Sequence, residues 1–115
     1  MSSGSLHYDV VVVGAGTAGS GAALQLARLG LRVALVDAKP LERAGPAWTV
    51  LVPPRLFDQA GIERPAGDEL VSDDFRHLIE GPEPGFGRVI VDPCPAWAVA
   101  LPPLVRRLHA QAAAA

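Results

Sequence analysis

Three closely spaced glycines and one aspartate are the residues of this chain whose types and spacing could do chemistry. Gly14, Gly16 and Gly19 form the pattern G-x-G-x-x-G, and Asp37 follows Gly19 by eighteen positions. Glycine permits a tight turn at the first position, close approach to a diphosphate at the second and close packing of a helix on a strand at the third. A helix beginning here presents free N–H groups and the positive end of its dipole to an anion. The pattern therefore predicts a site for the diphosphate of a dinucleotide.

Asp37 is expected to accept hydrogen bonds from the ribose hydroxyls of the adenosine half of that dinucleotide. Its charge would repel a 2′-phosphate, which disfavours NADP at this site. The residues alone leave FAD and NAD both open. The competing interpretation is that the glycines only form turns and that Asp37 only solvates a strand end. The predicted cofactor-binding residues are Gly14, Ala15, Gly16, Thr17, Ala18, Gly19, Asp37, Ala38 and Lys39.

The elements that must position these residues are a strand, a helix and a second strand. Residues 8–13 end in four consecutive valines, which predict a strand buried on both faces, as in a parallel sheet. Residues 17–29 change to helical spacing, and Gly30 is placed to end the helix. The predicted packing face of this helix holds Ala18, Ala22, Leu26 and Leu29, with Ala23 beside them. Residues 31–36 form the next strand, so the order predicts a βαβ unit with a right-handed crossover.

The rest of the chain predicts smaller elements. Residues 40–54 are rich in Pro and Gly and are predicted as a loop, after which Pro54 opens a short helix through Ala60. Residues 63–74 are polar and turn-rich. Residues 75–79 and 86–91 predict a hairpin around 81–85. Pro102 and Pro103 suit the first turn of a last helix, with Leu104, Leu108 and Ala112 on one face.

The predicted fold class is α/β, a Rossmann-like βαβ dinucleotide-binding unit with an additional short hairpin and a C-terminal helix, forming an incomplete domain. Residues 1–7 are predicted as a loose tail, 8–39 as the ADP-binding βαβ unit, and 40–115 as a loop, hairpin and helix extension. A first strand of this kind is central in a doubly wound sheet and requires cover on both faces. We therefore expect the chain to be the N-terminal part of a longer protein.

Composition excludes several classes of protein. Hydrophobic residues make up 50% of the 115 residues and charged residues 19%, which argues against disorder. The net charge of −2 and the lack of a basic stripe argue against nucleic acid as a partner. A single cysteine, Cys94, excludes internal disulfides and indicates a cytoplasmic setting. The three histidines lack metal-ligand spacing, and no uninterrupted apolar run approaches the ~18 residues of a membrane span.

Other side chains admit a functional interpretation and a structural one, and the structural one is favoured. Trp48 could face a flavin or substrate, and Arg43 and Arg55 could hold phosphate, but packing and solvated loop positions suit them better. Trp97 is predicted in the core, His77 in packing, and Cys94 as a plain thiol. No residue is predicted to be catalytic.

The segments H-Y-D-V-V-V-V-G-A-G-T-A-G-S and V-A-L-V-D resemble the N-terminus of FAD-dependent oxidoreductases of the glutathione-reductase-like superfamily. The resemblance is closer to the branch that holds flavin monooxygenases, geranylgeranyl-reductase-like enzymes and flavin halogenases. It covers residues 8–37 well and residues 41–62 more loosely. That branch often carries an arginine near position 102, where this chain has Pro102 and Pro103. The first arginine here is Arg106, which is therefore left outside the predicted site.

This resemblance implies FAD as the cofactor, with its ADP half bound by the βαβ unit. It also implies an oxidoreductase of monooxygenase or reductase type, acting on an unidentified small-molecule substrate, with NAD(P)H as an electron donor. Two alternatives stay open at this point: an NAD-binding dehydrogenase domain and a non-enzymatic nucleotide-binding module.

Overall fold

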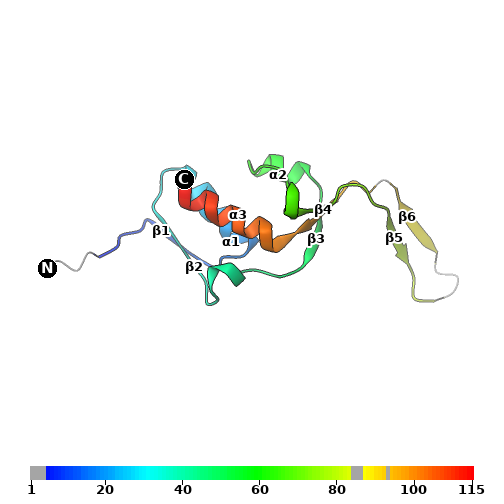
Figure 1. Ribbon diagram of the computed structural model, residues 1–115, viewed down its shortest axis with the longest axis horizontal. Helices are drawn as coiled ribbons and strands as arrows, with labels where there is room; N and C mark the ends of the chain where they lie inside the picture. The colour runs from blue at the N-terminus through cyan, green and yellow to red at the C-terminus, as the bar shows by residue number, and fades with distance from the viewer. Residues whose placement is uncertain (1–4, 84–86, 93) are drawn as a thin grey trace. The chain divides into compact units, whose positions relative to one another are not determined.

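The computed structural model describes residues 5–83, 87–92 and 94–115. Helices and strands alternate irregularly along it (Figure 1). The strands are β1 (Val10–Val13), β2 (Val33–Val36), β3 (Thr49–Val52), β4 (Leu70–Ser72), β5 (His77–Glu80), β6 (Arg88–Val91) and β7 (Trp97–Ala100). The α-helices are α1 (Thr17–Arg28), α2 (Arg55–Gln59) and α3 (Leu101–Ala114), and short 3-10 helices cover Leu41–Arg43 and Gly67–Glu69.

The chain divides into two compact units. The first runs from the N-terminus to Trp48 and resumes at Leu101–Ala115, while the second comprises Thr49–Ala100. The first unit contains β1, α1, β2 and α3. The second contains all the other strands together with α2. The C-terminal helix α3 thus belongs to the same compact unit as the N-terminal segment of the chain.

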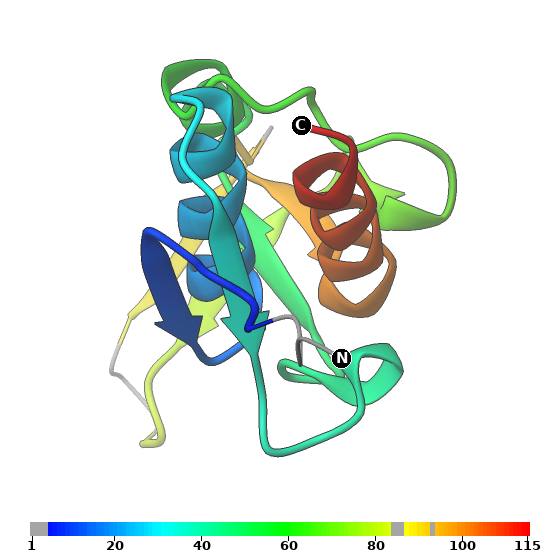
Figure 2. The same ribbon diagram turned by 90° about the vertical axis from the view of Figure 1, so that its left-hand side faces the viewer.

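The first unit is built on the predicted βαβ arrangement. Strands β1 and β2 pair in parallel, with Val10 opposite Val33 and Val13 opposite Val36. Figure 2 shows the two strands side by side, with α1 packed behind them and α3 alongside α1. The prediction of a strand, a helix and a parallel strand is confirmed, although the strands are shorter than the predicted ranges 8–13 and 31–36.

Helix α1 buries only part of the predicted face: Ala23 is buried and Leu26 is half-buried. Its buried residues are Ser20, Ala23 and Leu24, whereas Ala18, Ala22 and Leu29 are exposed. Helix α3 packs against α1, and Leu104, Val105 and Leu108 of α3 are buried. The prediction was wrong for Ala18, Ala22 and Leu29, because small residues occur all round α1. Apolar spacing alone could not show which side meets the sheet and α3.

The valine strand is covered on one face. Val10 and Val12 are half-buried, but Val11 and Val13 are 58% and 81% exposed. The prediction that β1 is buried on both faces is therefore wrong for this chain, because α1 packs on one face of the β1–β2 sheet. Strands of parallel sheets usually have both faces covered, so the exposure of Val11 and Val13 is unusual for such a strand.

The second unit contains a three-stranded antiparallel sheet that sequence reasoning missed. Its order is β3–β7–β4, with Val50 opposite Val99 and Leu70 also opposite Val99. Strand β3 lies within residues 40–54, so the prediction of a loop there is wrong after Trp48. Likewise, β4 lies inside the supposedly turn-rich 63–74. These strands are three or four residues long and stand close to prolines, so the turn signals concealed them.

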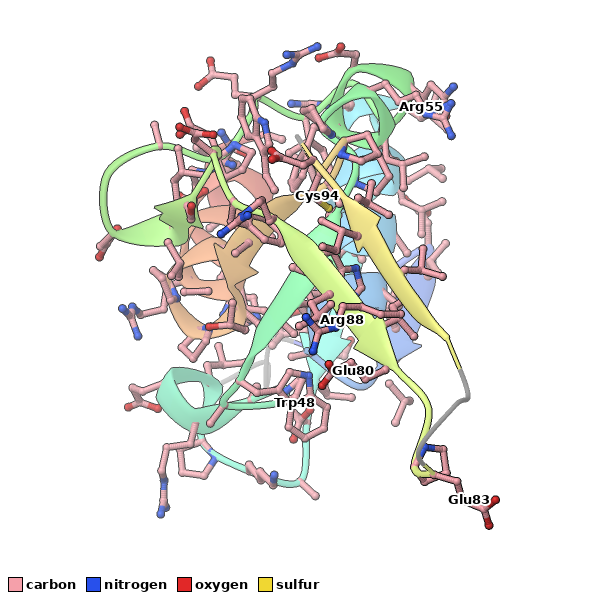
Figure 3. All side chains as sticks on the ribbon, turned by 90° about the vertical axis from the view of Figure 1, so that its right-hand side faces the viewer. Trp48, Arg55, Glu80, Glu83, Arg88 and Cys94 are labelled. Atoms are coloured by element: carbon pink, nitrogen blue, oxygen red, sulfur yellow. The ribbon has the colours of Figure 1, made fainter. Side chains whose placement is uncertain are left out.

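The predicted short helix and hairpin are present. Helix α2 spans Arg55–Gln59 with Pro54 at its N-cap, and β5 and β6 pair antiparallel. Figure 3 shows Glu80 and Arg88 beside each other on the two hairpin strands, where they form an ion pair of 2.5 Å. Residues 84–86, where the predicted second strand begins, lie outside the described residues.

Trp97 is less buried than predicted. Its side chain is partly exposed, and the Arg64 guanidinium lies 5.6 Å from the centre of its ring. Arg64 is held by two hydrogen bonds to Asp58, of 3.0 and 2.6 Å.

Cys94 is buried and is a free thiol.

Helix α3 begins as predicted, with Pro102 and Pro103 in its first turn. Proline is tolerated there because the N–H groups of a first turn have no partner within the helix. Leu104 and Leu108 are buried on one face, as predicted, and Ala112 is half-buried. No helix in the described part of the chain has the length and apolar character needed to cross a membrane.

Candidate nucleotide-binding site

The turn from β1 into α1 uses the special conformation of glycine. Gly14 has a φ of +102°, a region that residues with a Cβ rarely occupy. Its N–H donates to the Val36 carbonyl at 2.7 Å, which extends the pairing of β1 and β2 by one bond. The predicted tight turn at Gly14 is confirmed by this geometry.

Gly19 is the point of closest contact between α1 and the turn. A Cβ added at Gly19 would lie 1.6 Å from the Gly14 carbonyl oxygen and 3.5 Å from Val12. No side chain fits there, because non-bonded heavy atoms must stay more than about 3 Å apart. This confirms that Gly19 allows the helix to lie directly against the first strand.

The N-terminus of α1 has no side-chain cap. Gly16 is the N-cap residue, and the first bond of the helix runs from the Ser20 N–H to the Gly16 carbonyl at 2.9 Å. Among the described residues, no side chain caps this end of α1, and its first turn contains no acid. The first N–H groups of a helix otherwise lack partners, so this end suits an anion.

Asp37 lies immediately after β2 and reaches back to the glycine turn. Its Oδ2 accepts from the Ala15 N–H and its Oδ1 from the Lys39 N–H, both at 2.8 Å. These two hydrogen bonds, that of Ala15 first, lower the pKa of Asp37 below its ordinary value, and the charges of Lys39 and His109 contribute less. Asp37 is therefore ionised at neutral pH. A carboxylate has about four acceptor positions, so about half remain available to ligand hydroxyls.

Two residues that sequence reasoning did not include contact the backbone carbonyl of Ala15. The Ala15 carbonyl accepts from the Ser20 Oγ at 3.0 Å and lies 2.8 Å from the His109 Nε2. Ala15 itself is fully buried. Ser20 stands next to Gly19 and could have been suspected from its position. His109 comes from α3, and no local signal points to it.

Gly45 is a further residue that the sequence did not single out. Its φ is +84°, and a Cβ added there would lie 3.2 Å from the Gly16 Cα and 3.6 Å from Val105 Cγ2. The 44–46 segment thus passes close to the glycine turn. In the sequence, Gly45 looks like one of several loop glycines.

The remaining predicted site residues flank these groups. Thr17 is half-buried, and Ala18, Ala38 and Lys39 are exposed. Among the weaker candidates, Trp48 is 63% exposed and Arg43, Arg55 and Arg106 are exposed. Within the described part of the first unit, no hydrogen bond or ion pair joins Trp48, Arg43 or Arg106 to the glycine turn.

These observations fit the ADP half of a dinucleotide. A diphosphate requires N–H donors without competing side chains, and α1 offers an uncapped first turn. A ribose diol requires an ionised acceptor at the end of the second strand, and Asp37 is such a group. A parallel βαβ unit with this turn and this acid defines the class: a Rossmann-like dinucleotide-binding fold.

Comparison with known proteins narrows that class. Residues 9–48 match the family of FAD dependent oxidoreductases. This segment of the chain is therefore similar to a segment of the FAD dependent oxidoreductases. The match includes the glycine turn, Asp37 and Gly45.

Individual relatives share the same region. The chain is 48% identical over 67 residues to a digeranylgeranylglycerophospholipid reductase from Sulfolobus acidocaldarius, covering 56% of this chain and 15% of that protein. It is 57% identical over 35 residues to a soluble pyridine nucleotide transhydrogenase from Ectopseudomonas mendocina, covering 30% of this chain and 8% of that protein. The chain thus spans a small part of the length of these relatives.

The fold also matches a solved structure. A geranylgeranyl bacteriochlorophyll reductase-like protein from Thermoplasma acidophilum superposes with a TM-score of 0.68 at 22% identity, covering 93% of this chain and 28% of that one. This likeness supports the predicted α/β, Rossmann-like fold class as part of a larger protein's fold.

Proposed function

We propose that this chain binds the ADP half of FAD within an FAD-dependent oxidoreductase. The observation that carries the proposal is the pairing of an uncapped α1 N-terminus with Asp37, joined through the Ala15 peptide. One group suits a diphosphate and the other suits the adenosine ribose. The family match over residues 9–48 supports FAD rather than NAD as the dinucleotide.

Each predicted site residue has a part in this proposal. Gly14 and Gly19 shape the turn, and buried Ala15 holds Asp37 by its N–H. The N–H groups of the first turn receive the diphosphate, which involves residues 16–19. Ala38 and Lys39 border the ribose, and the Lys39 N–H orients the second oxygen of Asp37.

The type of reaction belongs to the proposal as well. FAD supplies the redox chemistry when bound, and the protein binds and orients it. Identity to a protein named as a reductase supports a reductase rather than a monooxygenase. The proposal includes a small-molecule substrate, NAD(P)H as electron donor and a cytoplasmic setting, the last supported by the single free cysteine.

A binding experiment with nucleotide fragments tests the central claim. The 115-residue chain is titrated with FAD, FMN, ADP and NADH, and binding is followed by calorimetry and flavin fluorescence. We expect FAD to bind, ADP to compete with it, and FMN to bind much more weakly because FMN lacks the ADP half.

Three outcomes would contradict the proposal. Equal affinity for FMN and FAD, or failure of ADP to compete, would show that the site does not recognise the ADP half. Tighter binding of NADH than of FAD would favour the NAD-binding alternative.

A further inference from the structure

Both backbone groups of Ala15, which belong to successive peptide units, are hydrogen-bonded in the glycine turn. Its N–H donates to Asp37, and its carbonyl is shared by Ser20 Oγ at 3.0 Å and His109 Nε2 at 2.8 Å. Because a carbonyl oxygen can only accept, His109 must carry its proton on Nε2 in this contact. Both acceptor positions of a buried carbonyl are therefore filled.

The His109 ring is held in place by the packing of α3. Val105 precedes His109 by four residues, so the two side chains share one face of the helix. Val105 is buried and lies near Gly45, which in turn lies against Gly16. The same face of α3 therefore contacts the glycine turn through His109 and lies near Gly45 through Val105.

We propose that His109 is a positioning residue for FAD binding: it fixes the Ala15–Gly16 peptide, and through the backbone of Ala15 it sets the orientation of Asp37 and of the first N–H groups of α1. The Ala15 N–H and carbonyl belong to opposite ends of one residue. The hydrogen bond from His109 restrains the Ala15 carbonyl, and it thereby also restrains the backbone of the turn that carries the Ala15 N–H. This inference rests on the proposed FAD site.

A matched pair of substitutions separates this role from simple filling of space. His109→Gln retains an N–H donor on a side chain of similar reach, and His109→Met has similar length and helix preference but no donor. Loss of one hydrogen bond predicts that His109→Met weakens FAD binding by about tenfold. His109→Gln should stay within about threefold of the wild-type chain on the same scale. Ala110→Ser, at the exposed neighbouring position, is the control and should bind as wild type.

Two measurements are made on every chain, and a third is made on the wild-type chain. Calorimetry measures the Kd for FAD, and circular dichroism measures the thermal midpoint of the unliganded chain, so that titrations are run where every variant is folded. Long-range ¹H–¹⁵N NMR of the unliganded wild-type chain reports which ring nitrogen of His109 carries the proton. We expect Nε2 to be protonated.

The outcomes distinguish the two proposals. A wild-type chain that binds neither FAD nor ADP overturns the proposed function and, with it, this inference. A wild-type chain that binds FAD while His109→Met binds equally well overturns this inference alone, as does equal weakening by Gln and Met. If His109→Met does not fold, an unprotonated Nε2 in the wild-type chain or weak binding by His109→Gln still overturns the role of His109.

Discussion

The backbones of Gly45 and Gly16 approach each other so closely that a Cβ added at Gly45 would lie 3.2 Å from the Gly16 Cα. Gly45 follows the second strand of the βαβ unit, and Gly16 caps α1. The contact places a segment after β2 against the turn at which we propose that the diphosphate binds. This contact thereby limits how far the backbone of the glycine turn can move.

Gly45→Ala should destabilise the chain more than Gly30→Ala. Both glycines have a φ of +84°, so an alanine at either position meets the same left-handed strain of about 1–2 kcal/mol. Only Gly45 also meets a neighbouring backbone, since a Cβ at Gly30 has nothing within 4 Å. Urea unfolding of both variants measures the difference. We also expect only Gly45→Ala to weaken FAD binding, and equal effects of the two would argue against a role for this close approach.

Gly19→Ala should prevent the first unit from folding. Its Cβ would lie 1.6 Å from the Gly14 carbonyl oxygen, a clash that only separation of α1 from the turn can relieve. We expect a loss of more than about 4 kcal/mol, the range in which single substitutions are exceptional. Thermal unfolding followed by circular dichroism measures it.

Gly21→Ala is the control for that experiment. Gly21 lies two residues further along the same helix, and a Cβ there meets nothing within 4 Å. Alanine should stabilise α1 by up to about 1 kcal/mol at this position. A cooperative, wild-type-like transition for Gly19→Ala would contradict the packing of α1 on β1.

Gly16→Val should remove measurable FAD binding. A branched side chain would stand where the turn approaches the diphosphate, and its Cβ alone would lie 3.4 Å from the Gly45 Cα. Gly16→Ala is the milder comparison, because φ is −76° at this position and a methyl group is only in close contact. Affinity for FAD and stability without FAD are measured for both. Unchanged affinity in Gly16→Val would mean that the turn is not the binding site.

The Asp37 carboxylate should make stability depend on pH in the acid range. Its pKa is lowered from 3.8 by hydrogen bonds from the Ala15 and Lys39 amides. A group whose pKa is lower in the folded state stabilises the fold above the unfolded-state pKa. That contribution is lost as the pH falls through the folded-state value, so the window lies below about pH 4.

Asp37→Asn isolates this contribution. The free energy of unfolding should be lower than that of the wild-type chain at pH 7, and the difference should shrink as the pH falls below about 4. Urea unfolding at pH 7, 5, 4 and 3 measures both chains. A difference that is the same at every pH would show that the charge of Asp37 does not take part.

The sequence by itself determined the βαβ unit and the residues at its turn. Valine runs, glycine spacing and an acid after the second strand are local signals. Each acts through the conformation of its own segment, as the φ of Gly14 and the contact of Gly19 illustrate. The proline-started helices α2 and α3 were predictable for the same reason.

Only the tertiary structure decided which distant residues meet the turn and which faces are covered. His109 lies 94 residues after Ala15 and reaches it because α3 packs on α1. That packing depends on the complementary surfaces of the two helices and not on the spacing of residues along the sequence. The buried face of α1 and the three-residue to four-residue strands of the second unit depend likewise on partners remote in the chain. Such contacts form from complementary surfaces that no short stretch of sequence contains, so composition and periodicity could not reveal them.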